Sequence, residues 1–438
     1  MRHFSAPPIP TDSTPAVNVY TGGMAQAHRW LLTRDFSLMW WSQVLSQVAE
    51  GISKLALLWF VYAVTGSPLK TTVIGLLQTL PPILFGPFIG VIVDRFPKKT
   101  ILIASDVARG VLIGLIPCLV SVEHFTVGSL YLLTFLYGVA TAVFVPTLSS
   151  AVPFMVTRPQ FTAANALLQS TTSLGIIIGP AVSGLGIAFA GSQDVLCLNA
   201  MTYFASAACL LPIRLRVTEA TTADGDGWRP FVRNLLEGIR YAFLTHRTVL
   251  MLIVLASVYT FGSGAFTTLF PVFGRHLLGL GPVEVGYLWS WLGVGLLFSS
   301  IGLIRMSGWD LSQRLSVITL SCALSGLALV GLTWTDDLRL AAVLVGGIGI
   351  GFGAWTPIAW GIIQEVAPAG MVGRVMAVYT ASATATSMLG MSAFGWVAES
   401  FGSVASLIGI GGVMVILAGG SAWFGKKVGV AKIEKADV

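Results

Sequence analysis

The chain has 438 residues, of which 55% are hydrophobic and only 10% are charged, and its mean hydropathy is +0.83. Soluble domains carry about a quarter charged residues, so this composition excludes an ordinary soluble enzyme. The net charge of +6 does not indicate nucleic-acid binding, because the Lys and Arg residues flank apolar runs instead of clustering on one soluble face.

The chain begins with residues 1–33, which are rich in Pro, Ser and Thr and lack the continuous apolar core of a cleavable signal peptide. We expect a disordered cytoplasmic tail here. Apolar runs long enough to cross a bilayer follow, since a membrane-spanning helix needs about 20 apolar residues. These runs start near Phe36, Thr71, Thr100, Val127, Asn165, Val195, Val249, Val285, Ser316, Ala341, Val375 and Val404. The sequence therefore predicts an all-α membrane protein with twelve transmembrane helices.

The longest polar stretch, residues 213–247, separates the sixth run from the seventh. Its second part predicts an amphipathic helix on the membrane surface, because apolar residues recur at every fourth position. These residues are Phe231, Leu235, Ile239 and Phe243. We therefore expect a six-helix bundle over 34–212, a cytoplasmic linker, a second six-helix bundle over 248–425 and a cytoplasmic tail over 426–438.

The two halves share small residues at a fixed offset of 211 positions. The matched pairs are Gly51 and Gly262, Gly75 and Gly286, Gly138 and Gly349, Pro146 and Pro357, Gly179 and Gly390, Gly184 and Gly395, and Gly191 and Gly402. Parallel repeats of this kind occur in transporters that rock two bundles around a midplane site. Coincidental glycine packing positions are the alternative.

The basic residues predict the orientation, because Lys and Arg near span ends stay in the cytoplasm. With a cytoplasmic N-terminus, most of the 25 Lys and Arg residues fall on the cytoplasmic side. The opposite side carries Lys70, Arg275 and Arg339, while Lys54 and Arg109 lie within apolar runs. Both termini are therefore expected in the cytoplasm, and we expect a multi-pass protein of the cell membrane.

The stretch "GVIVDRFPKKT" forms a short turn between the second and third runs. Its bases fix topology, Gly90 permits close helix approach, and Asp94 could contact the positive N-terminal end of a neighbouring helix in one conformation only. Gly90, Asp94, Arg95, Lys98 and Lys99 resemble the loop signature of the major facilitator superfamily, G-x-x-x-D-R-x-G-R-[RK]. Pro97 replaces the second glycine of the signature, and the second half has Arg305 opposite Asp94.

A second stretch, "GIIIGPAVSG", resembles the antiporter motif of the fifth helix in this superfamily, with Ser183 in place of one glycine. Its motif residues are Gly175, Gly179, Pro180 and Gly184. The segments "RDFSLMWWSQVLSQVAEG", "VYAVTGSPL", "PTLSSAVPFMVTRPQFTAANAL", "LLEGIRYAF" and "GRVMAV" resemble the drug:proton antiporter branch that includes macrolide efflux proteins and the enterobactin exporter. The resemblance implies a twelve-helix transporter that exchanges protons for a drug-like compound.

The first run carries a polar stripe, Gln43, Gln47, Glu50 and Lys54, within an arc of roughly 60° at 100° per residue. An ionisable group near the centre of a span is costly and is a functional hypothesis by default. We expect Glu50 to bind and release the coupling proton, and the family often has an acid here. Lys54 leaves two alternatives open, a structural ion pair or a switch that holds Glu50 deprotonated until substrate separates them.

Asp106 and Arg109 lie at i, i+3 in the third run and are expected to form a local pair and a conformational latch that could reach Asp94 or Arg95. Glu365 is expected as an interfacial anchor. The superfamily lines its cavity with the first, fourth, seventh and tenth spans, which makes the polar and aromatic residues of these spans candidates for substrate contact, with helix packing as the alternative. The candidates are Gln43, Gln47, Tyr259, Ser263, Thr267, Trp355 and Trp360.

Enzyme signals are absent from the sequence: the five His residues are expected in tails or loops, and there is no phosphate-binding glycine loop. The four Cys residues lie in apolar runs without metal-ligand spacing, so we expect no cofactor and no metal. We therefore predict a monomeric, proton-coupled exporter of an amphiphilic compound, and we expect the protein to contact membrane lipids. The alternatives are a facilitator or importer of a small polar or zwitterionic solute, a lysolipid flippase, and a membrane scaffold or receptor.

Overall fold

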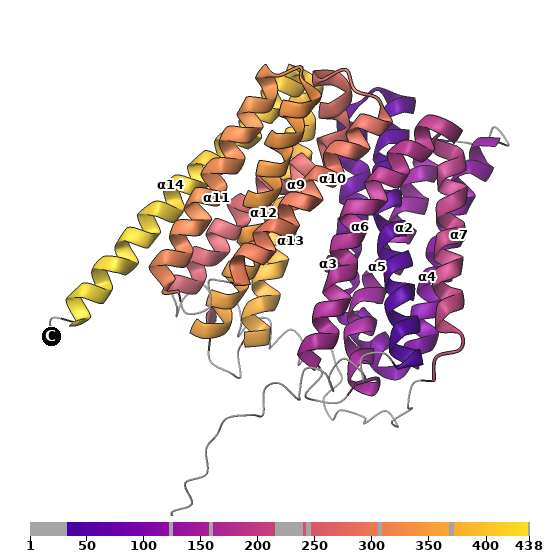
Figure 1. Ribbon diagram of the computed structural model, residues 1–438, viewed down its shortest axis with the longest axis horizontal. Helices are drawn as coiled ribbons and strands as arrows, with labels where there is room; N and C mark the ends of the chain where they lie inside the picture. The colour runs from indigo at the N-terminus through magenta and orange to yellow at the C-terminus, as the bar shows by residue number, and fades with distance from the viewer. Residues whose placement is uncertain are drawn as a thin grey trace, which may run out of the picture.

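The computed structural model describes residues 33–121, 126–156, 161–214, 240–241, 247–304, 309–367 and 372–436. Within these ranges the secondary structure is helical, without strands (Figure 1). The first six long helices are α2 (Arg34–Thr65), α3 (Pro68–Arg95), α4 (Lys98–Ser121), α5 (Val127–Ala151), α6 (Phe161–Ala190) and α7 (Ser192–Leu210). The last six are α9 (Arg247–Leu277), α10 (Pro282–Ile304), α11 (Leu311–Gly331), α12 (Leu338–Val366), α13 (Val372–Phe401) and α14 (Ser403–Ala436).

These helices coincide with the twelve predicted runs, so the predicted helix number and order are confirmed for the described residues. Short 3-10 turns, η1 (Val152–Phe154) and η4 (Leu332–Trp334), follow α5 and α11. Nine of the described helices are long and apolar enough to cross a membrane by composition alone. The long helices not among these nine are α3, α7 and α13.

The helices pack as two groups, which Figure 1 shows as an indigo-to-magenta set beside an orange-to-yellow set. In the first group α2 packs on α6 and α7, and α5 packs on α3 and α4. In the second group α9 packs on α13 and α14, and α12 packs on α10 and α11. The groups meet chiefly where α6 packs on α10 and α3 packs on α13. This is the predicted arrangement of two six-helix bundles.

The predicted bundle boundaries at 34–212 and 248–425 remain predictions. Of the linker 213–247, the structure describes residues 213–214, 240–241 and 247. The proposed amphipathic positions Phe231, Leu235, Ile239 and Phe243 lie outside the described residues, as do Arg305 and the tail 1–33 apart from Thr33.

Some of the glycine pairs of the repeat occupy equivalent places, whereas Gly51 packs against α6 and Gly262 packs against α14. Gly191 and Gly402 both have φ +88°, in the left-handed region, directly before α7 and α14. A Cβ on Gly184 would lie 2.4 Å from the carbonyl oxygen of Pro282, and a Cβ on Gly395 would lie 2.6 Å from the side chain of Thr72. Gly184 and Gly395 therefore allow the close α6–α10 and α3–α13 contacts, which are equivalent interfaces in the two halves. This supports a true repeat over coincidental packing.

Candidate functional site

A cavity of about 210 Å³ lies where the two bundles meet. Its walls come from α2, α3, α5, α9 and α13, and the lining residues are Glu50, Lys54, Leu58, Gly75, Gln78, Thr79, Tyr137, Gly138, Thr141, Thr267, Thr268 and Met391. Glu50 and Lys54 are the charged members of this lining, and hydroxyl and amide groups supply most of its other polar atoms. The cavity can therefore bind a charged group and also accept apolar surface.

Glu50 and Lys54 lie one turn apart on α2, which places both on the face that α2 turns toward the cavity. Their charges interact electrostatically. Among the described residues, ion pairs join Arg109 to Asp106 and Arg314 to Glu365. Glu50 and Lys54 do not form such a pair. Lys54 Nζ instead lies 5.7 Å from the centroid of the Trp289 ring on α10. The cation thus contacts the opposite bundle.

Behind the cavity wall, hydrogen-bonded side chains connect α2, α5 and α7. The Tyr137 and Tyr203 hydroxyl oxygens lie 2.6 Å apart, and Asn199 Nδ2 donates to Ser53 Oγ at 2.6 Å. Tyr137 also lines the cavity, so this network begins at the cavity surface. It pairs the two phenols, the Ser53 hydroxyl and the Asn199 amide nitrogen, which would be costly unpaired inside an apolar bundle, while Asn199 Oδ1 has no partner among the described residues.

The predicted Asp106–Arg109 pair is present and fully buried, with side chains 0% and 1% exposed. Ser206 Oγ donates to Asp106 Oδ2 at 2.7 Å and Ser46 Oγ donates to Asp106 Oδ1 at 3.3 Å. The Arg109 guanidinium also lies over two rings, 4.2 Å from the centroid of Phe144 and 4.8 Å from that of Tyr203. These partners all belong to the N-terminal bundle, so the pair ties α2, α4, α5 and α7 together. Its predicted role as a latch remains a prediction.

The predicted substrate-contact residues differ in whether they line the cavity. Thr267 lines the cavity, whereas Gln43 is buried inside the N-terminal bundle and Gln47 packs with its backbone against Gly175 of α6. Trp360 is 41% exposed on the surface of α12. Ser263, on α9, is half-buried and hydrogen-bonds through its side chain to Tyr259.

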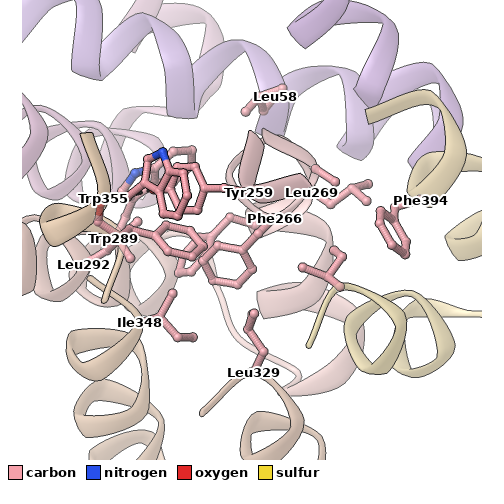
Figure 2. Close-up of a cluster of buried hydrophobic side chains, with 14 of the residues drawn as sticks. Leu58, Tyr259, Phe266, Leu269, Trp289, Leu292, Leu329, Ile348, Trp355 and Phe394 are labelled. Carbon is pink, nitrogen blue, oxygen red and sulfur yellow. Dashed lines mark hydrogen bonds between the residues drawn. The ribbon is translucent and has the colours of Figure 1, made fainter. Parts of the chain in front are cut away.

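Tyr259 and Trp355 lie in the aromatic core of the C-terminal bundle, where Figure 2 shows them together. Their rings stack with centroids 4.9 Å apart and planes inclined by 13°. Tyr259 OH donates to the carbonyl oxygen of Phe352 at 3.1 Å, and Trp355 Nε1 donates to Tyr379 OH at 3.1 Å. Both residues therefore have their polar atoms satisfied within the bundle, as the packing alternative expects.

Sequence reasoning missed several residues of the cavity lining, namely Gln78, Thr79, Tyr137, Thr141 and Met391. The signal was available for Gln78, which interrupts the apolar run of α3 as Glu50 interrupts that of α2. An isolated polar residue in a span must face protein or water, so the same argument applies to both.

The turn of the loop signature is as short as predicted, since α3 ends at Arg95 and α4 begins at Lys98. Lys98 Nζ donates to the carbonyl oxygen of Val93 near the C-terminal end of α3. Lys99 Nζ donates to the carbonyl oxygen of Leu211, just beyond α7, at 2.5 Å. Cations at helix C-terminal ends satisfy free carbonyls and oppose the helix dipole. The side chain of Asp94 and the surroundings of Gly90 lie outside the described atoms, so the proposed contact of Asp94 remains a prediction.

The glycine motif of α6 serves two helix contacts. A Cβ on Gly175 would lie 2.5 Å from the carbonyl oxygen of Gln47, and one on Gly179 would lie 2.7 Å from the Cα of Gly51, so both permit the approach of α2. Farther along, Gly184 and the carbonyl oxygen of Pro180 meet α10 of the other bundle. The motif residues therefore support close packing at both contacts.

Polar contacts close the molecule at one end, here called the hairpin side, where α2 ends, α3 begins, and α9 and α13 end. Glu399 of α13 accepts hydrogen bonds from Ser67 Oγ at 2.7 Å and from the backbone N–H of Leu69 at 3.2 Å, which caps α3 from the opposite bundle. The Arg275 guanidinium lies 5.5 Å from the Trp59 ring centroid. His276, expected in a loop, lies in the last turn of α9, with its ring 5.6 Å from that of Tyr62.

Glu365 lies near the C-terminal end of α12, as expected of an interfacial anchor, and accepts a hydrogen bond of 2.6 Å from Arg314 Nη1. Within the described residues no cluster of His, Cys, Asp and Glu is suited to a metal ion.

The family model described as Major Facilitator Superfamily matches residues 39–390 of this chain. Macrolide efflux protein A of Streptococcus pyogenes is 23% identical over 354 residues, which cover 80% of this chain and 86% of that protein. The multidrug efflux pump Tap of Mycolicibacterium fortuitum is 26% identical over 385 residues, which cover 84% of this chain and 90% of that protein.

Solved structures of transporters share the fold at low sequence identity. The nucleoside transporter NupG superposes with a TM-score of 0.69 at 12% identity, covering 90% of this chain and 98% of that one. A bacterial homologue of the human lysosomal transporter Spinster, in an inward-facing and unoccupied conformation, superposes with a TM-score of 0.70 at 13% identity, covering 90% of this chain and 97% of that one.

Proposed function

Because the chain belongs to the Major Facilitator Superfamily, we propose that it exports amphiphilic organic compounds, such as drugs, macrolides or siderophore-like molecules, in exchange for protons. The two bundles would expose the cavity to each side of the membrane in turn. Twelve long helices in the described residues, nine of them apolar enough to cross a membrane, and the family identify a multi-pass membrane protein. We further propose that this membrane is the cell membrane and that both termini face the cytoplasm.

The observation that carries this proposal is the place of Glu50, a carboxylate in the cavity between the two bundles. Ionisable groups inside membrane proteins are costly, and they mark ion and substrate pathways. A group that both bundles enclose can exchange protons with one side and then with the other as the bundles rearrange. The names of the relatives, a macrolide efflux protein and a multidrug efflux pump, support the outward direction and the amphiphilic substrate class.

The first experiment follows proton movement in vesicles that contain the purified protein, after addition of a macrolide, a cationic dye, a catechol siderophore or a lysolipid. We expect at least one of these amphiphiles to drive proton flux in the wild type. Glu50→Gln keeps the size of the side chain but cannot release a proton, so it should still bind the compound while substrate-driven proton flux falls to background.

Glu365→Gln is the matched control, because Glu365 is exposed at the end of α12 and pairs with Arg314 away from the cavity. This variant should keep wild-type proton flux. Unchanged coupling in Glu50→Gln would remove Glu50 from the mechanism and leave the charges of α2 with a structural role.

A second candidate function follows from the proximity of Glu50 and Lys54 in one cavity. A carboxylate and an ammonium one turn apart match the charges of a zwitterionic solute, which the protein would then carry as a facilitator or importer. Uptake of labelled zwitterions into the same vesicles distinguishes the two, because a facilitator should move the solute without a proton gradient.

A further inference from the structure

One contact at the cavity joins the two bundles through a charge. Lys54 Nζ of α2 lies 5.7 Å from the centroid of the Trp289 ring of α10. Trp289 is 3% exposed, and its ring packs against Phe270 with centroids 5.1 Å apart. The face of an indole ring attracts a cation, and a ring packed in this way is a fixed surface. The ammonium group is thus held by an aromatic wall that belongs to the other bundle.

The repeat gives independent support for the place of Trp289. Its repeat mate, 211 positions earlier, is Gln78 of α3, which lines the cavity. The helices α3 and α10 occupy equivalent positions, since each packs against a helix of the opposite bundle. Trp289 therefore lies on α10 at the position equivalent to that of Gln78, a cavity residue, on α3.

The charged and titratable neighbours of Glu50 are few in the described structure. When Glu50 is ionised, its carboxylate interacts with Lys54 on its own helix, Arg109 on α4, Tyr137 on α5 and Tyr203 on α7. Arg109 is already paired with Asp106, and the two phenols hydrogen-bond to each other. Among these neighbours, Lys54 is the one that contacts the other bundle, so its position depends on how the bundles are arranged.

We propose that Trp289 is a positioning residue that holds Lys54 away from Glu50 while the hairpin side is closed. In this conformation Glu50 carries the proton. When the exported compound enters the cavity in this conformation and displaces Lys54 from the Trp289 ring, the freed ammonium approaches the carboxyl group one turn away on α2. The carboxyl group then releases its proton to cavity water on the cytoplasmic side, opposite to the closed hairpin side, and pairs with Lys54, so the proton moves against the exported compound. This inference rests on the proposed proton coupling at Glu50.

The test is the pH dependence of substrate-driven transport in vesicles, with a macrolide as the probe. Trp289→Leu frees Lys54 to approach Glu50, so protonation should need a lower pH, and the midpoint of the profile should fall by about one pH unit. Trp289→Phe keeps an aromatic face and should give a smaller shift in the same direction. Lys54→Met removes the competing cation and should raise the midpoint. Trp291→Leu, on the same helix and 38% exposed, is the control and should leave the profile unchanged.

A double variant separates positioning from packing. If Trp289 acts through Lys54, then Trp289→Phe in the Lys54→Met background should cause no further shift. An equal shift with and without Lys54 would overturn the inference, as would a wild-type midpoint in Trp289→Phe and Trp289→Leu while Glu50→Gln abolishes coupling. Unchanged coupling in Glu50→Gln would instead overturn the proposed function itself, and the inference with it.

Discussion

At the scale of single residues, the buried pair of Asp106 and Arg109 should be a major determinant of stability in the N-terminal bundle. Removing one partner of a buried ion pair leaves an uncompensated charge and costs about 3–5 kcal/mol. Asp106→Asn keeps the shape of the side chain but strands the Arg109 guanidinium, which has Ser46 as its other hydrogen-bond partner. We expect a clearly lower midpoint temperature of unfolding when the purified protein is heated in detergent micelles.

Asp194→Asn is the matched control for Asp106→Asn, because Asp194 is an exposed acid in the first turn of α7. Its loss should cost less than about 1 kcal/mol, the usual effect of an acid at a helix N-terminus. The apolar double variant Asp106→Leu with Arg109→Met should be more stable than Asp106→Asn, since no buried charge remains. Equal stability of Asp106→Asn and the wild type would show that Arg109 is compensated by other groups.

Which residues face the cavity could be predicted only in part. Glu50, Lys54 and Thr267 follow from polar residues in apolar runs, and all three line the cavity. Tyr259 and Trp355 fit the same rule but point into the core of their own bundle, because an amphipathic ring can satisfy its polar atom with a neighbouring helix. The rotation of each helix about its axis is set by its packing partners, and a single sequence does not contain this information.

At the scale of helices, the contact between α6 and α10 depends on the absence of a side chain at Gly184. A Cβ there would lie 2.4 Å from a backbone oxygen of Pro282, which cannot move without moving the helix. Gly184→Ala should therefore push the two helices apart and favour an open hairpin side. Spin labels on the ends of α6 and α10 should report a longer average distance than in the wild type.

Gly302→Ala serves as the reference for this measurement, because a Cβ on Gly302 of α10 would meet no atom within 4 Å. It should leave the distance unchanged and slightly favour the helix, in which Ala is the better former. A wild-type distance in Gly184→Ala would mean that the backbone of α10 adapts locally without separation of the bundles.

At the scale of the whole molecule, the fold could be predicted nearly completely, and its conformation could not. Helix number and order follow from apolar runs, because each run must satisfy its backbone within a membrane. The repeat offset also predicts the equivalence of Gly191 and Gly402, which share φ +88°. At the closed hairpin side, Glu399 accepts a hydrogen bond from Ser67, 332 positions away in the sequence. No periodicity connects residues that far apart.

Glu399 should hold the two bundles together at the hairpin side. It accepts hydrogen bonds from Ser67 Oγ and from the backbone N–H of Leu69, and because Glu399 is exposed these bonds should contribute about 0.5–1.5 kcal/mol each. Glu399→Ala removes both bonds, so the population with an open hairpin side should rise by about tenfold for each 1.4 kcal/mol lost. A cysteine introduced at the cavity residue Thr267, in a chain without its native cysteines, should react correspondingly faster with a membrane-impermeant thiol reagent added on that side.

Two further variants make this prediction specific to the contact between the bundles. Glu399→Gln keeps an oxygen acceptor without the charge, so its labelling rate should lie between those of Glu399→Ala and the wild type. Glu284→Ala removes an acid from the first turn of α10, at the same end of the molecule, and should label like the wild type. If Glu399→Ala labels no faster than Glu284→Ala, the hairpin side is held by the packing of α6 on α10 and of α3 on α13, and the carboxylate only caps α3.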